Sequence, residues 1–143
     1  MYPLAHLAGS LLLNEACRGD RASVAAGAIV PDPIDKTLAW VLGVTPSGRH
    51  AAHSLASASA LTLATVRFAG RRRAASFGAS YLCHLVGDTW EGGHVPWLMP
   101  FRRYAHSERR WKLGMTWRTA LLELVGMVIL ARLATRWFME GEP

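Results

Sequence analysis

The sequence of 143 residues has only two cysteines, Cys17 and Cys83, which lie far apart in separate apolar stretches. Neither belongs to a Cys-x-x-Cys pair, so the sequence excludes a zinc ribbon and a thioredoxin-like redox motif. We expect two small buried thiols, because free cysteine packs like a small apolar residue. A chain of this length can bury a core without disulfides, and it fits one domain over residues 1–143.

Acidic residues and lysine are also scarce. Lys and Arg together outnumber Asp and Glu by 16 to 10, and nearly all of the basic residues are arginine. The resulting pI of about 10.2 indicates an anionic partner, which could be nucleic acid, an anionic membrane surface or a phosphorylated substrate. Hydrophobic residues make up 51% of the chain, and the arginines cluster between apolar runs as juxtamembrane charges do. We therefore expect a multi-pass or peripheral protein of the inner membrane that contacts lipid, with a soluble basic bundle as the alternative.

Strand patterns are nearly absent, because apolar and polar residues rarely alternate and Ala and Leu dominate. The sequence predicts an all-α bundle of about five helices. Their expected ranges are Leu4–Cys17, Arg21–Ile29, Ala51–Phe68, Ala74–Thr89 and Trp117–Trp137. Asp20 is the expected N-cap of the second helix, and Gly70 marks a tight turn. Two prolines predict a loop from Pro31 to Arg49, with some helical character near residues 37–42, and a second long loop is expected over 91–110.

No segment reaches the roughly 20 uninterrupted apolar residues that mark a membrane-spanning helix. The best candidates are Ala51–Val66 and Thr119–Ala131, the second interrupted by Glu123. Trp117 and Trp137 bracket the last helix at a spacing of about 30 Å, which suits an aromatic belt. In a membrane Glu123 should face the bundle interior and find a partner. The N-terminus shows no convincing cleavable signal, so we expect it to belong to the fold.

Three short motifs carry histidine and aspartate at close spacing. They are P-D-P-I-D-K with Asp32 and Asp35, G-R-H-A-A-H-S with His50 and His53, and H-L-V-G-D with His84 and Asp88. The last pair is four residues apart on a predicted helix, so both side chains share one face and can bind one metal ion. Each motif alone also fits an ordinary reading: a solvated turn, a polar first turn capped by Ser47 or Ser54, or a helix-end pair.

Chain geometry brings the motifs together. His53 lies 17 residues before Gly70, and His84 and Asp88 lie 14 and 18 residues after it, so these side chains end at the same level of an antiparallel hairpin. In the first hairpin His6 lies 12 residues before Arg18, and Asp32 lies 14 after it. Burying such groups in apolar surroundings is costly unless a metal or strong pairing compensates. The sequence therefore predicts a metal site at one pole of the bundle.

The order of these motifs resembles the membrane-bound, metal-dependent hydrolase family of bacteria and archaea. The stretches that carry the resemblance are A-I-V-P-D-P-I-D-K, G-R-H-A-A-H-S, Y-L-C-H-L-V-G-D-T-W and V-P-W-L-M-P-F, within Pro3–Phe101. The last helix is similar only in being apolar. The resemblance implies a helical membrane hydrolase of generally unassigned substrate. The metal ligands that it implies are His6, Asp32, Asp35, His53, His84 and Asp88, with His50 and His94 in a second tier.

Ligands of this kind, without thiolate, suit zinc first, with manganese or iron as alternatives. Six ligands exceed what one catalytic ion takes from a protein, so a two-metal site is an option. Arg49 and Lys36 flank the ligands and are the candidate catalytic residues, holding the phosphate of an anionic or lipid-linked phosphoester. Their alternative role is snorkelling at a membrane surface. The alternative function is a non-enzymatic membrane interaction or regulatory module with a structural or sensing metal, and no specific nucleic acid is expected.

Two arginine clusters leave the orientation in the membrane open. Arg67–Arg73 would mark a cytoplasmic end by the positive-inside rule, which puts the metal pole on the opposite side. A second cluster follows the metal pole and argues for the reverse. Its members are Arg102, Arg103, Arg109, Arg110 and Lys112.

Overall fold

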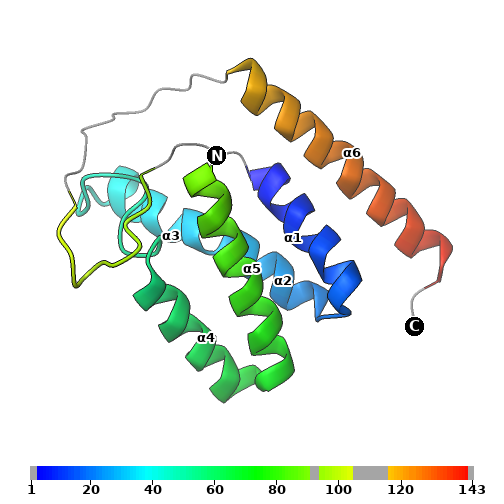
Figure 1. The fold of residues 1–143 in the computed structure, drawn as a ribbon, viewed down its shortest axis with the longest axis horizontal. Coiled ribbons are helices and arrows are strands. Elements are labelled where there is room, and N and C mark those ends of the chain that lie inside the picture. The colour runs from blue at the N-terminus through cyan, green and yellow to red at the C-terminus, as the bar shows by residue number, and fades with distance from the viewer. Residues whose placement is uncertain (1–2, 91–93, 105–115, 142–143) are drawn as a thin grey trace.

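The computed structural model describes residues 3–90, 94–104 and 116–141, and these residues form helices and loops without any strand (Figure 1). The helices are α1 (Pro3–Cys17), α2 (Arg21–Ile29), α3 (Pro31–Lys36), the π-helix η1 (Thr37–Val41), α4 (Leu55–Ala69), α5 (Arg71–Trp90) and α6 (Trp117–Met139). The all-α prediction is confirmed for these residues. Residues 91–93 and 105–110 of the loop expected over 91–110, which include Arg109 and Arg110, lie outside them, as does Lys112.

Helices α1 and α2 form the expected first hairpin. Arg18 adopts a φ of 51° directly after α1, which reverses the chain. The carboxylate of Asp20 then accepts a hydrogen bond of 2.9 Å from the backbone N–H of Ser23, so the predicted N-cap of α2 is confirmed.

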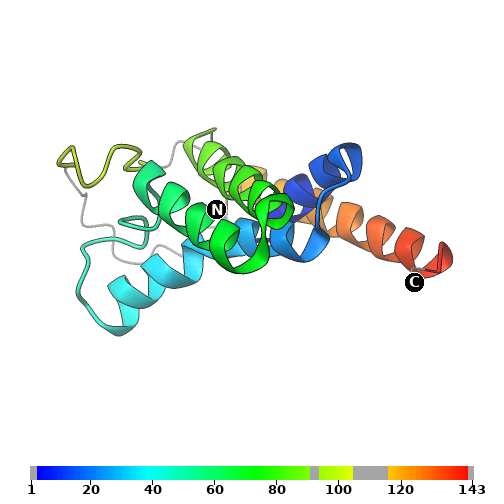
Figure 2. The same ribbon diagram turned by 90° about the horizontal axis from the view of Figure 1, so that it is seen from below.

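The loop expected from Pro31 is wrong over residues 31–36, which form α3, whereas the helical character expected near residues 37–42 is confirmed by η1. Pro31 occupies the first position of α3, where a helix needs no N–H donor and the fixed φ of proline suits the first turn. The π-helix η1 continues from α3, so the chain turns irregular only after Val41. Figure 2 shows α3 continuing past the end of α2 toward the side of the molecule where the segments 42–54 and 94–104 lie.

Helices α4 and α5 form the second expected hairpin. Helix α4 starts at Leu55 rather than at Ala51, because Ser54 caps it by accepting from the N–H of Ser57 at 3.2 Å. Gly70, with a φ of 88°, reverses the chain directly into α5. The two helices pack closely at Gly78, where a Cβ atom would lie 2.8 Å from the Thr62 hydroxyl.

The hairpins pack through α2 and α5, and α6 lies along the outer side of α1 (Figure 1). At Gly27 the backbone of α2 comes so near to α5 that a Cβ atom would lie 2.3 Å from the Phe77 carbonyl oxygen. One apolar cluster lies between the second hairpin and the loop that follows it, formed by Ala58, Phe77, Tyr81, Leu85 and Val95. A second joins α1, α2 and α6 through Leu11, Val24 and Leu133.

Helix α6 is anchored to the start of α1 by Glu123. Its carboxylate accepts hydrogen bonds from the backbone N–H groups of Leu4 (3.3 Å) and Ala5 (3.0 Å). Glu123 is thus partly buried and finds a partner in the N-terminus of α1, where the hydrogen bond from Leu4 is exposed and the one from Ala5 is part-buried.

No helix among the described residues combines the length and apolarity needed to cross a membrane, so the spanning segments expected at Ala51–Val66 and Thr119–Ala131 are not supported. The expectation of two buried thiols is wrong for Cys17, which is exposed in the last turn of α1, and Cys83 is partly buried.

Candidate metal centre

His84 and Asp88 lie one turn apart on the face of α5 that points into the bundle. Both are buried, with about 1% of each residue exposed. The Nδ1–H of His84 donates to the backbone carbonyl of Ala28 on α2 at 2.7 Å, and that hydrogen bond sets the orientation of the ring. The Nε2 atom of His84 therefore points toward the Asp88 carboxylate, 3.8 Å away.

His53, in the segment that precedes α4, lies next to His84 and Asp88. Asp35 of α3 contacts the ring nitrogen of His53 that faces away from these two residues. The Nδ1–H of His53 donates to Asp35 Oδ2 at 2.7 Å. Asp35 is fully buried and also accepts from the backbone N–H groups of His50 (2.6 Å), Ala52 (3.0 Å) and His53 (3.1 Å). Asp35 thus orients His53 and stabilises the segment 50–53, while Nε2 of His53 faces the cluster.

The remaining side chains complete a compact His/Asp cluster, which we define as His6, Asp32, His53, His84 and Asp88. The Nε2 atoms of His53 and His84 are 3.3 Å apart, and Nε2 of His53 lies 3.3 Å from Asp88 and 3.6 Å from Asp32. His6 stacks on the His84 ring at 4.1 Å and places its Nε2 3.2 Å from Asp88 Oδ1.

Within the cluster, two overlapping groups hold their ligand atoms within 4.8 Å of one another. They are His6, His84 and Asp88, and Asp32, His53 and His84. Because His84 belongs to both groups, the arrangement offers positions for one ion or for two neighbouring ones.

Hydrogen bonding explains why this cluster fits a cation. In neutral His53 and His84 the proton sits on Nδ1, since each Nδ1 faces an acceptor: Asp35 in one case and the Ala28 carbonyl in the other. Both Nε2 lone pairs then face each other and two carboxylates, with no donor between them. A divalent metal satisfies such a set of atoms, and the outer hydrogen bonds to Nδ1 are those that metal-bound histidines make. The residues present therefore fit a metal ion.

The pKa values of the cluster residues also favour a bound cation. Burial opposes charge on His53, but its hydrogen bonds to the carboxylates of Asp32, Asp35 and Asp88 outweigh burial and raise the pKa of His53 to about 10. Burial, aided by neighbouring His6, lowers the pKa of His84 to about 4. Despite its burial, Asp88 has a pKa well below its usual range because His53, His6 and Arg49 stabilise its charge. The site thus keeps its carboxylate charged and stabilises positive charge at its centre.

The two candidate catalytic residues each pair with one acid of the cluster. Arg49 contacts Asp88 with two nitrogens, Nε at 2.5 Å and Nη2 at 2.9 Å, and the Lys36 ammonium lies 2.5 Å from Asp32. About 30% of each basic side chain is exposed, namely 29% for Arg49 and 31% for Lys36, whereas His53 is fully buried. An anion approaching from outside would meet these cations before it reached the histidines.

The structure separates the sequence-predicted residues into two layers. Five lie in the cluster itself, whereas Asp35 lies behind His53 and contacts the other ring nitrogen. Of the second-tier residues, His50 contributes its backbone N–H to Asp35, and His94 is exposed on the following loop. Sequence reasoning missed the buried Tyr81, whose hydroxyl donates to the Ala52 carbonyl at 2.5 Å, and the Ala28 carbonyl. Backbone acceptors leave no signal in a sequence, so neither contact could be read from a motif.

The fold and the cluster define an all-α protein with a buried His/Asp site suited to a divalent metal. Over residues 1–141 the chain matches the family described as YdjM inner membrane protein, and it belongs to that family. Membership supports the expected location at the inner membrane. No curated protein and no solved structure gave a significant match. The family description concerns the membrane, so the resemblance to hydrolases remains a proposal.

Proposed function

We propose that the His/Asp cluster binds one or two divalent transition-metal ions, zinc in the first place, and that the protein is a metal-dependent hydrolase of an anionic or lipid-linked phosphoester. The observation that carries the proposal is the 3.3 Å approach of the His53 and His84 Nε2 atoms, with both Nδ1 atoms facing acceptors. With both histidines neutral, apolar surroundings would leave these two lone pairs without a donor or a cation.

The ligand chemistry also favours this choice of metal. Imidazole and carboxylate without thiolate suit zinc, with manganese or iron as alternatives, whereas magnesium and calcium prefer oxygen ligands alone. A bound ion of this class would lower the pKa of a water molecule and polarise a phosphoryl oxygen.

The protein's own residues would orient the substrate. Arg49 uses Nε and Nη2 on Asp88, which leaves the second terminal nitrogen of its guanidinium available to a phosphate oxygen. Lys36 holds Asp32 and can share its remaining protons with an anion. Both cations lie on the exposed side of the cluster, so they favour substrates with negative charge over neutral esters.

Metal analysis of the purified full chain tests this proposal, with a His84→Ala variant and a His94→Ala control. His84 belongs to both ligand groups, so its loss should abolish stoichiometric metal and any phosphoesterase activity while helical content stays unchanged. His94 is exposed, and its loss should change neither. Wild-type protein that neither contains nor takes up zinc, manganese or iron would end the proposal.

A second candidate function is a closed metal site that stabilises or regulates the protein without catalysis. The burial of His53, His84 and Asp88 favours it, because a structural site shields its ion from water. Full metal occupancy with no turnover on a broad panel of phosphoesters would support this reading over hydrolysis.

A further inference from the structure

A second feature lies at the other pole of the bundle, where the turns of both hairpins meet the end of α6. The N–H of Asp20 donates to the Ser76 hydroxyl at 2.9 Å, and the Arg72 guanidinium donates to the Arg18 carbonyl at 3.1 Å. These two contacts join the first turn, at residues 18–20, to the start of α5. Gly19 allows the close approach, since a Cβ atom there would lie 2.6 Å from the Ser76 hydroxyl oxygen.

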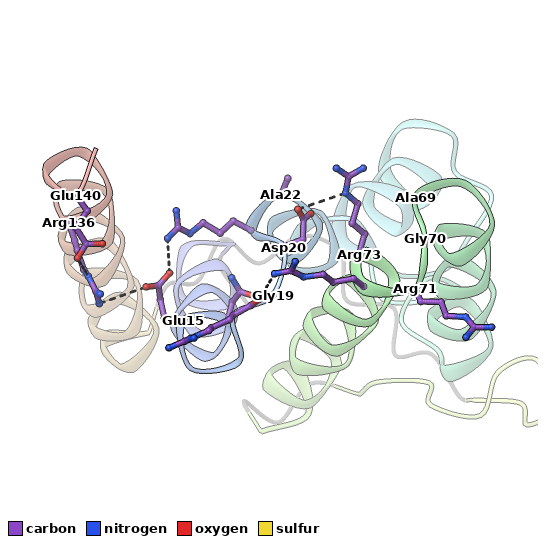
Figure 3. Close-up of a pocket in the computed structure, with 14 residues that line it drawn as sticks. Glu15, Gly19, Asp20, Ala22, Ala69, Gly70, Arg71, Arg73, Arg136 and Glu140 are labelled. Carbon is purple, nitrogen blue, oxygen red and sulfur yellow. Dashed lines mark hydrogen bonds and ion pairs between the residues drawn. The ribbon is translucent and has the colours of Figure 1, made fainter. Parts of the chain in front are cut away.

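Helix α6 completes this pole through its last turns. Trp137 donates its indole N–H to Glu15 at 3.2 Å, and the Arg21 guanidinium lies 4.2 Å from the centre of the Trp137 ring. Arg136 lies 3.8 Å from Glu15 and 2.6 Å from Glu140 (Figure 3). Three segments that are distant in the sequence therefore place their arginines close together at this pole.

We define the arginine pole as the lining of the open, polar depression between these segments, whose volume is about 920 Å³. Its charged residues are six arginines and three acids, a surplus of three positive charges. They are Arg18, Arg21, Arg71, Arg72, Arg73 and Arg136, with Glu15, Asp20 and Glu140.

The surplus positive charge lies on the arginines that have no acidic partner. Arg21, Arg73 and Arg136 each have an acid within 4 Å. Among the described residues Arg18, Arg71 and Arg72 form no ion pair, and Arg71 extends away from the labelled acids in Figure 3. The depression also contains the N-terminus of the 20-residue α5, where the helix dipole adds positive potential.

We propose that the arginine pole binds the anionic phosphate headgroups of the inner membrane's phospholipids. Guanidinium groups bind phosphate through paired donors, and clustered arginines are drawn to anionic lipid surfaces. The family places the chain at the inner membrane, which supplies such a surface. Along α5, Arg72 and His84 are separated by 12 residues or about 18 Å, so this contact is distinct from the His/Asp cluster.

The test compares lipid binding by the full chain in a neutral detergent. Phosphatidylglycerol or phosphatidylcholine is added in mixed micelles, and bound lipid is counted by native mass spectrometry. The test variant is Arg18→Gln with Arg71→Gln. The matched control is Arg102→Gln with Arg103→Gln, which removes the same charge from exposed arginines in the 94–104 loop. Circular dichroism establishes that both variants keep their helices.

We expect the wild type to prefer phosphatidylglycerol, and the test variant to lose about 30-fold in affinity for it, at about fivefold for each arginine. The control variant should bind like the wild type, and Arg18→Lys with Arg71→Lys should retain most of the affinity. Equal losses in test and control variants would overturn the proposal, because net charge alone would then explain binding.

Two further experiments test whether free phosphate or DNA, rather than lipid, is the anion that binds. Displacement of the lipid by inorganic phosphate at comparable concentration would assign the depression to a free phosphate and overturn the lipid proposal. Tighter binding to DNA than to phosphatidylglycerol, lost in the same test variant, would assign it to nucleic acid. The proposal is supported when phosphate fails to displace the lipid and DNA also fails to outcompete it. None of these results depends on metal at the other pole.

Discussion

His53 and Asp35 form the contact on which the geometry of the cluster depends. The Nδ1–H of His53 donates to Asp35 Oδ2 at 2.7 Å, and both side chains are fully buried. Asp35 also accepts from three backbone N–H groups, so its position does not depend on the imidazole ring of His53. The carboxylate therefore determines which nitrogen of His53 faces Asp32, Asp88 and His84.

Replacing Asp35 with Asn should weaken metal binding without removing a cluster residue. The amide is a poorer acceptor and can present N–H₂ to His53, which favours the wrong tautomer. We expect zinc affinity to fall about 10–100-fold, measured by competition with a chromophoric chelator. Asp20→Asn is the matched control, because Asn also caps helices and Asp20 lies at the other pole. Unchanged affinity in Asp35→Asn would show that Asp35 does not orient His53.

The metal-free protein should lose stability as the pH rises above neutrality. In the folded state the pKa of His53 is raised to about 10 from an ordinary 6.5. Its contribution to stability is therefore complete below pH 6.5 and is lost as the pH rises through about 10. We expect the Tm of chelator-treated protein to fall across this window.

Zinc should reduce that fall, because the ion takes the place of the proton on Nε2. A His53→Gln variant should also show a smaller fall, since it has no imidazolium to lose. Thermal unfolding followed by circular dichroism from pH 6.5 to 10 checks both expectations. An identical pH profile for metal-free wild type and His53→Gln would contradict the role of His53.

Gly27→Ala should disturb the cluster from a distance. A Cβ atom at Gly27 would lie 2.3 Å from the Phe77 carbonyl, so α2 must move away from α5. That movement would take the Ala28 carbonyl away from His84, and we expect a loss of about 1–3 kcal/mol in the free energy of unfolding. The matched control is Gly9→Ala in α1, where nothing lies within 4 Å. It should stabilise the protein by about 0.5–1 kcal/mol, as measured by denaturant unfolding.

Glu123→Ala should loosen α6 from the rest of the bundle. The substitution removes the carboxylate that caps the N–H groups of Leu4 and Ala5 in the first turn of α1, at a cost of about 0.5–2 kcal/mol. Faster protease cleavage within α6 and a lower Tm are the expected readouts. Glu140→Ala removes an exposed acid from the end of the same helix and should change both much less. Equal effects from the two substitutions would show that the cap at α1 is unimportant.

Much of the helical framework could be predicted because its signals are local. Asp20 and Gly70 sit where a cap and a turn require those residue types, and the equal arms around Gly70 predict that His53 and His84 meet. The same local logic failed at Pro31, since proline both stops a helix and starts one. Which of the two happens depends on whether the following residues have something to pack against.

The helical class, the two hairpins and the histidines and aspartates that share one pole can all be read from the sequence, because spacing along a helix fixes the distance along its axis. The role of each of these residues becomes clear only in the folded chain. Asp35 faces the Nδ1 of His53 instead of joining the cluster, and Arg49 pairs with Asp88. The tertiary structure also brought Arg18, Arg71 and Arg136 to one depression. Such assignments depend on side-chain direction and on backbone donors from other segments, and linear spacing contains neither.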